Sequence, residues 1–300
     1  MNMREKDTFS GYHPLVNMLY FAAVFAFSMI LSHPICLAIS FVCAFFYALY
    51  LNGGKALRFH LKYMLPMLFL TALINPAFNH RGVTVLAYFP NGNPLTLESV
   101  LYGVAAAFML ITIITWFSCF NAVMTSDKFV YLFGRIFPAL SLILAISLRL
   151  VPRYKAQIRV IADAQRCIGR DVSTGGVLRR ARCGLKILSI LVTWALESAI
   201  ETADSMRCRG YGLPKRTAFS IFRFGRRDRP ALLFLLFAGG CMSVGAATGE
   251  LGFLYFPMTE SIWSGARAAG LFVCYFALCA MPAAIGLWED RKWKSLRSNI

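Results

Sequence analysis

Two copies of one polar phrase hold the side chains in this chain that are best suited to bind a protein partner. Residues 162–169 read Ala-Asp-Ala-Gln-Arg-Cys-Ile-Gly and residues 203–210 read Ala-Asp-Ser-Met-Arg-Cys-Arg-Gly, with five of the eight positions identical. An arginine presents a rigid fork of donors to a carboxylate or to backbone carbonyls. Small alanine and cysteine side chains allow close approach, and glycine ends a helix without a side chain in the way. The duplication predicts two equivalent partner surfaces that are bound at the same time.

The candidate partner-binding residues belong to this phrase and to the position after its first copy. They are Asp163, Arg166, Cys167, Ile168, Gly169 and Arg170 in the first copy and Asp204, Arg207, Cys208, Arg209 and Gly210 in the second. In each copy an aspartate precedes an arginine by three residues, so the two side chains can pair on one helix. Such exposed pairs contribute at most about 1 kcal/mol, so we expect them to orient the arginine. A plain helix end, with arginine favoured by the helix dipole, is the structural alternative.

Both phrases are expected at the ends of amphipathic helices that lie along the inner membrane face. An apolar stretch at 136–148 leads to Pro152, which can open the next helix because proline is tolerated in a first turn, and that helix reaches Gly169. A further helix is expected from about residue 178 to residue 208. We predict that these two helices cross with a basic face against an acidic one. The residues of these faces are Lys155, Arg159 and Arg166 on the first helix and Glu197, Glu201 and Asp204 on the second.

The composition places the rest of the chain in a membrane. Of the 300 residues, 58% are hydrophobic and 15% are charged, against roughly half and a quarter in soluble domains. Runs without Lys, Arg, Asp or Glu cover residues 14–54, 63–80, 99–126, 231–249 and 268–288. About 20 apolar residues cross a bilayer, so the first run predicts two spans with a reversal at His33-Pro34. We predict an all-α integral membrane protein with about six transmembrane helices plus long amphipathic helices at the cytoplasmic face.

The distribution of charge divides and orients the chain. We expect a four-span unit at residues 1–126, the two amphipathic helices at 127–229, and a two-span unit with a basic tail at 230–300. Residues 149–229 hold 18 Lys and Arg against 6 Asp and Glu, in a chain of net charge +17. Because Lys and Arg gather on the cytoplasmic side of membrane proteins, this segment and both termini are predicted to be cytoplasmic. The basic residues at 215–229 suit anionic lipid headgroups of the bilayer.

The sequence contains no visible catalytic or metal-binding constellation. Residues 53–56, Gly-Gly-Lys-Ala, lack the length and the hydroxyl of a phosphate-binding loop. The four histidines lie far apart, and the nine cysteines form no C-x-x-C pair, so neither a metal site nor a disulfide framework is indicated. We therefore expect no catalytic residue, no bound metal and no cofactor in this chain.

These motifs resemble the transmembrane T component of energy-coupling factor transporters. The resemblance covers about residues 12–290. It rests on Asn75-Pro76, Thr96-Leu97-Glu98, Arg149-Leu150-Val151-Pro152, Ala164-Gln165 with Gly169, and the run Met-Arg-Cys-Arg-Gly-Tyr-Gly at 206–212. The family carries Ala-Arg-Gly signatures at the ends of two coupling helices, which correspond here to 167–169 and 208–210. Cysteine replaces alanine in both, and Ile168 replaces the arginine of the first, so Arg166 or Arg170 would have to supply the fork, or that contact is apolar.

The resemblance implies a non-catalytic scaffold in an ATP-driven importer. Two ATP-binding-cassette subunits, identical or homologous, would each receive one helix tip, and they would use the ATP and magnesium. A small membrane substrate-binding S component would pack on the helices for uptake of a vitamin or a metal ion. The implied location is the cytoplasmic membrane of a bacterium or archaeon, and no nucleic acid partner is expected.

Two other functions remain open from the residues. A substrate-conducting permease subunit of an importer would need one coupling helix and polar residues within its spans. This chain has two phrases, and its apolar runs contain no ionisable side chain except histidines near their ends, which favours a scaffold. An integral membrane lipid-modifying enzyme would need clustered aspartates for metal and phosphate. Asp163 and Asp171 come nearest, but their spacing and the missing partner carboxylates argue against that function.

Overall fold

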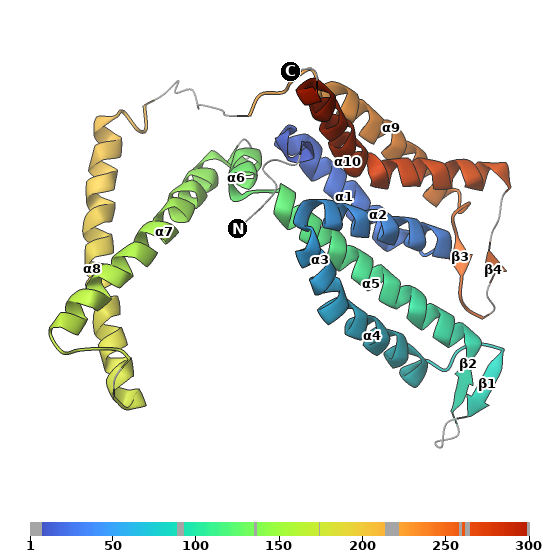
Figure 1. The fold of residues 1–300 in the computed structure, drawn as a ribbon, viewed down its shortest axis with the longest axis horizontal. Coiled ribbons are helices and arrows are strands. Elements are labelled where there is room, and N and C mark those ends of the chain that lie inside the picture. Colours follow the sequence, from blue (N-terminus) through green and yellow to red (C-terminus); the bar gives the residue numbers. More distant parts are fainter. Residues whose placement is uncertain are drawn as a thin grey trace. The chain divides into compact units, whose positions relative to one another are not determined.

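The computed structural model describes residues 8–88, 93–134, 137–173, 175–213, 222–257, 260–261 and 265–298. The chain divides into two compact units (Figure 1). Unit 1 comprises Met1–Thr125 and Phe222–Ile300, and unit 2 comprises Ser126–Ile221. Unit 1 contains the uncharged runs that precede and follow the polar phrases in the sequence, and unit 2 contains both copies of the polar phrase. Part of the basic stretch expected to face lipid, residues 215–221, lies outside the described residues.

Unit 1 is built from helices and two short hairpins. Its elements are η1 (Phe9–Gly11), α1 (Pro14–Ile30), α2 (Pro34–Asn52), α3 (Gly54–Phe59), the π-helical η2 (His60–Met64), α4 (Leu65–Phe78), β1 (Val85–Tyr88), β2 (Pro94–Thr96), α5 (Leu97–Val123), α9 (Asp228–Ala247), β3 (Phe253–Leu254), β4 (Glu260–Ser261) and α10 (Ala266–Ser298). Strand β1 pairs antiparallel with β2, and β3 pairs antiparallel with β4.

Histidine–proline pairs start the first two helices. Pro14 and Pro34 occupy the first turns of α1 and α2, where a missing backbone N–H breaks no helical hydrogen bond. The Nδ1 atoms of His13 and His33 each accept a hydrogen bond, at 3.2 Å, from the backbone N–H two residues on. The imidazole thus caps the helix, and the reversal predicted at His33-Pro34 is confirmed.

In the described parts of the chain, six helices are long and apolar enough to cross a membrane, so the predicted all-α membrane fold is confirmed. They are Pro34–Asn52, Gly54–Phe78, Leu97–Val123, Val177–Cys208, Asp228–Ala247 and Arg267–Trp293. The membership of this set differs from the prediction at two places. Helix α1 falls outside it with 17 residues, whereas α8 (Val177–Cys208) enters it because its 32 residues contain an apolar middle between charged ends.

Aromatic side chains from three helices form the centre of unit 1. The fully buried ring of Trp116 in α5 has its centroid 6.2 Å from that of Tyr20, 6.4 Å from Phe21 and 6.3 Å from Tyr47. Its indole Nε1 donates a hydrogen bond to Ser40 Oγ at 3.0 Å. A membrane interior offers no water to an unpaired N–H, so this bond allows a polar aromatic ring to lie in the core. One residue therefore contacts both α1 and α2.

Unit 2 contains α6 (Ser126–Gly134) and two long helices, α7 (Pro138–Cys167) and α8. Pro152 lies inside α7, so the prediction that this proline opens a new helix is wrong. The apolar stretch and the basic stretch form one helix of 30 residues. An internal proline removes one backbone hydrogen bond, but the segments on both sides continue to gain one bond per helical residue.

Helices α7 and α8 cross each other (Figure 1), and the side chains buried where they meet form an apolar seam. Three buried aliphatic residues form its centre: Ile161 of α7 with Ile187 and Leu191 of α8. Beside them the ring of Tyr154 meets that of Trp194 edge-on at 5.9 Å, and the guanidinium of Arg153 lies over the same indole at 5.0 Å. This seam fixes the crossing point of the two helices that carry the polar phrases.

Replacing the central tryptophan tests the assigned core of unit 1. Trp116→Ala is expected to lower the free energy of unfolding by about 3–5 kcal/mol, because it leaves a cavity and removes the Ser40 bond. Thermal unfolding of the purified chain in detergent measures the change. Trp288→Ala is the matched control, since Trp288 is 65% exposed and its loss opens no cavity. Equal shifts of the unfolding midpoint in both variants would contradict this core.

Candidate partner-binding tips

The two polar phrases end their helices with the same backbone geometry. We name residues 163–170 the first tip and residues 204–210 the second tip. Helix α7 ends at Cys167 and α8 at Cys208, and the glycine two residues later, Gly169 or Gly210, has a φ of +76° in both. Glycine adopts this left-handed backbone freely, whereas a side chain there costs about 1–2 kcal/mol. Both helices therefore end at the place that the position of the glycine in the sequence predicts.

Each glycine closes its helix with the same pair of hydrogen bonds. In the first tip the Gly169 N–H donates to the Arg166 carbonyl at 2.9 Å, and the following N–H donates to the Gln165 carbonyl at 3.0 Å. In the second tip the equivalent bonds reach the Arg207 carbonyl at 2.9 Å and the Met206 carbonyl at 3.0 Å. This Schellman arrangement satisfies carbonyls that a helix end otherwise leaves unpaired. The backbone of both tips is thus a glycine cap, as the structural alternative predicts.

The side chains of both tips project into solvent, which a glycine cap alone does not require. The exposed residues are Asp163, Arg166, Cys167, Ile168 and Arg170 in the first tip and Asp204, Arg207, Cys208 and Arg209 in the second. Ile168 is 67% exposed at the position where the second tip has Arg209. The predicted residues therefore gather in two clusters, one at the end of each long helix.

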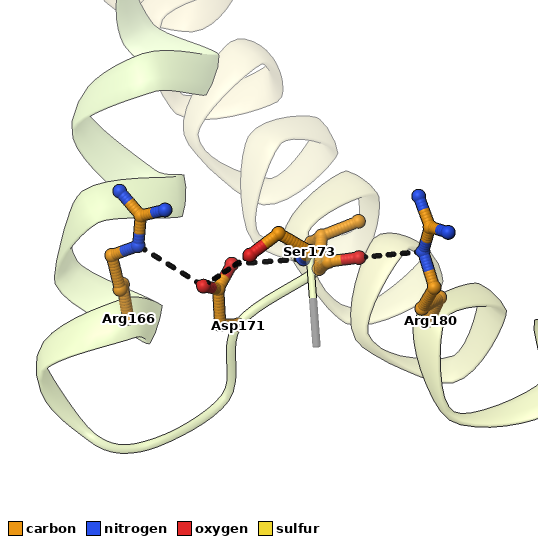
Figure 2. Close-up of polar contacts among 5 residues, drawn as sticks. Arg166, Asp171, Ser173 and Arg180 are labelled. Carbon is orange, nitrogen blue, oxygen red and sulfur yellow. Dashed lines mark hydrogen bonds and ion pairs between the residues drawn. The ribbon is translucent and has the colours of Figure 1, made fainter. Parts of the chain in front are cut away.

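A carboxylate from the following loop braces the first tip (Figure 2). Arg166 Nε donates to Asp171 Oδ2 at 3.2 Å, and the same carboxylate accepts hydrogen bonds from the Ser173 hydroxyl and backbone N–H. These donors, the Ser173 hydroxyl first, hold the pKa of Asp171 at about 2, below its ordinary 3.8. Among the described residues the ion pair of this arginine is with Asp171, whereas the sequence predicts Asp163.

A second arginine lies beside this brace. Arg180 Nε donates to the Val172 carbonyl at 2.8 Å, and Figure 2 shows Asp171 and Ser173 between this arginine and Arg166. Both arginines line a cavity of about 330 Å³, together with Ala162, Asp163, Asp171, Val172 and Ser173. Sequence reasoning missed this group, although an aspartate two residues before a serine is a common turn signal.

The second tip has no equivalent of the Arg166–Asp171 ion pair in the part of the chain that the structure describes. No ion pair there involves Asp204 or Arg207, so the predicted pairing of these two side chains is not seen. Arg209 is the cap residue itself, at the position between Cys208 and Gly210. Its side chain is exposed, so its donor fork is presented at the end of the helix.

The charged faces predicted to oppose each other do not form the helix crossing. Lys155, Arg159, Glu197 and Glu201 are all exposed, and no ion pair joins them within the described ranges. The seam is apolar instead. Exposed ion pairs contribute little, whereas each buried aliphatic side chain contributes about 1.5–3 kcal/mol. Burial therefore decides which faces of α7 and α8 meet.

Among the described residues, neither tip gathers the donor set of a metal site. Over the described residues, no group of three or more His, Cys, Asp or Glu is placed to hold a metal ion. Asp163 and Asp171 do line one cavity, but Asp171 is already engaged by Arg166 and Ser173. What the tips can offer is hydrogen bonding, charge and a close backbone approach to another molecule.

Comparison with known proteins finds a family whose sequence model covers both tips. Residues 10–219 match the sequence model of CbiQ, described as cobalt transport protein. This range includes Gly169 and Gly210 and covers more than half of the chain. The chain belongs to the CbiQ family. It is a multi-pass membrane protein of a transport family, in agreement with its apolar helices.

The relatives of this CbiQ-family chain include proteins named energy-coupling factor transporter transmembrane protein EcfT. The one from Lactobacillus helveticus is 27% identical over 248 residues, which are 77% of this chain and 85% of that protein. The one from Lacticaseibacillus paracasei is 37% identical over 90 residues, or 30% of this chain and 34% of the relative. The one from Leuconostoc gelidum is 35% identical over 98 residues, or 32% and 37%. The resemblance to energy-coupling factor transmembrane components is confirmed.

Alanine in place of either tip glycine tests the cap. Gly169→Ala and Gly210→Ala are expected to loosen the last turn by about 1–2 kcal/mol, because a Cβ disfavours the left-handed backbone. Hydrogen exchange at the Arg170 and Tyr211 amides should then accelerate roughly 5–30-fold. Gly184→Ala is the control, since Gly184 lies inside α8 with open space around it, and alanine there should stabilise the helix. Unchanged exchange in both tip variants would argue against the caps.

The brace of the first tip predicts a specific pH dependence. Because the folded pKa of Asp171 is about 2, below its ordinary 3.8, the brace is complete above that ordinary value and is lost as the pH falls through about 2. Ser173→Ala should raise the pKa of Asp171 toward 3.8, since it removes the strongest donor. Carboxyl NMR titration measures this shift, and Ser189→Ala, on the exposed side of α8, should leave it unchanged. A pKa that stays near 2 without the Ser173 hydroxyl would refute this account.

Proposed function

We propose that this chain is the coupling subunit of an energy-coupling factor importer, which passes an ATPase movement through its two tips to a substrate-binding membrane protein. The observation that carries the proposal is the matched pair of helix ends, with φ of +76° at Gly169 and Gly210. One glycine cap is an ordinary way to end a helix. Two in one chain, each beside an exposed arginine and cysteine, support two docking ends of similar shape.

The proposed partners are two ATP-binding-cassette subunits, identical or homologous, each of which receives one tip. These subunits use the ATP and magnesium, whereas this chain supplies shape and charge. The exposed fork of Arg209 suits a carboxylate or backbone carbonyls in a surface groove. The tips must bind the two nucleotide states of the ATPases unequally, because a tip that binds both states equally transmits nothing.

Unit 2 is suited to transmit such a movement. Helices α7 and α8 contain 30 and 32 residues, and a helix of this size is about 45 Å long. Their buried seam joins the helices, so displacement of one tip moves more than its last turn. We assign the exposed apolar side chains of both helices to contacts with the bilayer and with a small membrane S component. They include Leu140, Ile143, Leu188, Val192 and Leu196.

The proposed location is the cytoplasmic membrane, with both termini and both tips on the cytoplasmic side. The strong positive charge of residues 149–229 supports this orientation. On this proposal the S component binds the transported compound, which is a vitamin or a metal ion. The family description as cobalt transport protein supports a metal ion as one class of substrate. No specific contact in the described residues favours a substrate-conducting permease or a lipid-modifying enzyme.

Reversing the charge of the second tip tests the proposed coupling. Arg209→Glu should weaken ATPase docking roughly tenfold or more, because it replaces a donor fork with a repelling carboxylate. The measurements are the amount of ATPase that co-purifies with the tagged chain and ATP-driven uptake by the reconstituted complex. Arg291→Glu is the matched control, since it makes the same charge change at an exposed position of α10.

Two results would contradict this proposal. Wild-type levels of ATPase binding and uptake in the Arg209→Glu chain would remove the role assigned to that side chain. Purification of the wild-type chain without any ATPase subunit, under conditions that keep membrane complexes intact, would remove the coupling function itself.

A further inference from the structure

The two tips have the same backbone conformation but differ in the side chain at the cap position. Arg209 occupies that position in the second tip and Ile168 in the first. If a groove on an ATPase holds a carboxylate, the first tip needs a guanidinium from another position. Arg166 and Arg170, on either side of the cap, are the two arginines of that tip.

Arg166 is the arginine that the structure holds in place. Its Nε is fixed by Asp171 at 3.2 Å, and Asp171 is fixed in turn by Ser173. A guanidinium has five N–H donors, so the Nη groups stay available, and the side chain is still 63% exposed. The Arg170 side chain has no ion pair with any described residue, so binding through it would cost about 0.5–1.5 kcal/mol in lost rotamer freedom.

Arg180 adds a second guanidinium to the same cavity. Its Nε is held by the Val172 carbonyl at 2.8 Å, and Figure 2 shows Asp171 and Ser173 between this arginine and Arg166. Two carboxylates also line this cavity of about 330 Å³. That of Asp171 is occupied by its three donors, whereas that of Asp163 has no ion pair among the described residues and would repel an incoming anion.

We propose that Arg166, positioned by Asp171 and Ser173 and assisted by Arg180, binds an acidic side chain at the rim of an ATPase groove. This inference rests on the proposed function and names the contact that the first tip makes without an arginine at its cap. Charge complementarity selects a carboxylate, because both arginines line one cavity. The exposed Ile168 beside it packs on an apolar part of the same groove. Asp171 and Ser173 are positioning residues, since they act through Arg166.

The test uses the full chain in phosphatidylcholine nanodiscs and the ATPase pair that co-purifies with the wild type. Arg166→Gln should lower the affinity of this pair roughly tenfold. Arg291→Gln, at an exposed arginine of α10 outside both tips, should change it by less than about twofold. Asp171→Asn should lower it about threefold, because it frees the Arg166 side chain. The same change should add nothing in the Arg166→Gln chain, and this loss of additivity distinguishes positioning from a general structural effect.

A variant that gains affinity keeps the test independent of misfolding. Asp163→Asn removes the repelling carboxylate from the cavity, so it should raise the affinity of the ATPase pair about two- to threefold. An unchanged or lowered affinity in that variant would overturn the proposal. Wild-type affinity in the Arg166→Gln chain would do so as well.

The outcomes also separate this inference from the proposed function. Binding that is lost in Arg209→Glu but intact in Arg166→Gln keeps the coupling function and overturns the role of Arg166. Failure of the wild-type chain to retain any ATPase overturns both. A further measurement compares vesicles with and without phosphatidylglycerol. If Arg166→Gln weakens only the binding to anionic lipid, a headgroup is the ligand and the proposed protein contact is wrong.

Discussion

The architecture of unit 2 depends on how a helix can end in water. A helix leaves its last carbonyls without partners, and a side chain that capped them would cover the end of the helix. Gly169 and Gly210 avoid this with a backbone φ of +76°, and in each the N–H of the glycine and that of the next residue donate back to helix carbonyls. The last carbonyls of each helix therefore have hydrogen-bond partners, and no side chain covers the end of the helix. The residue that stops each helix also leaves its neighbours, Cys167 and Cys208, exposed beside an open backbone.

An uncovered helix end can pass on a movement only if its helix keeps its position relative to the helix that it crosses. The crossing of α7 and α8 meets this need with buried aliphatic side chains and with the indole of Trp194, which contacts both Tyr154 and Arg153. Burial of such surface stabilises a contact by roughly 25 cal/mol per Å², whereas exposed ion pairs are weak and are screened by salt. A seam made of exposed ion pairs would have held the two helices together less strongly. The charged stripes of the two helices are free to face water instead.

The sequence predicts the elements of this chain well because each has a local cause. Uncharged runs give the spans, since a bilayer demands a fixed length, and the two tip glycines give the helix ends. Pro152 misleads because a proline weakens a helix without ending it when both flanks are helical. The bond of Arg166 to Asp171 escapes prediction because it crosses a loop, whereas helix spacing rules look only three or four residues away. The charged stripes similarly say nothing about which face is buried, because that depends on the partner helix.

The difference between the tips constrains the motor proposed to receive them. Suppose that both grooves hold the carboxylate that pairs with Arg209 of the second tip. In the groove that receives the first tip, this carboxylate would lose its water and find no donor, because Ile168 stands at the cap position, and the loss would cost about 1–3 kcal/mol. Arg166 cannot simply take over, because it lies within α7, two residues before the cap position, and its Nε is held by Asp171. On the proposed function, two identical grooves would therefore meet different side chains at the two tips.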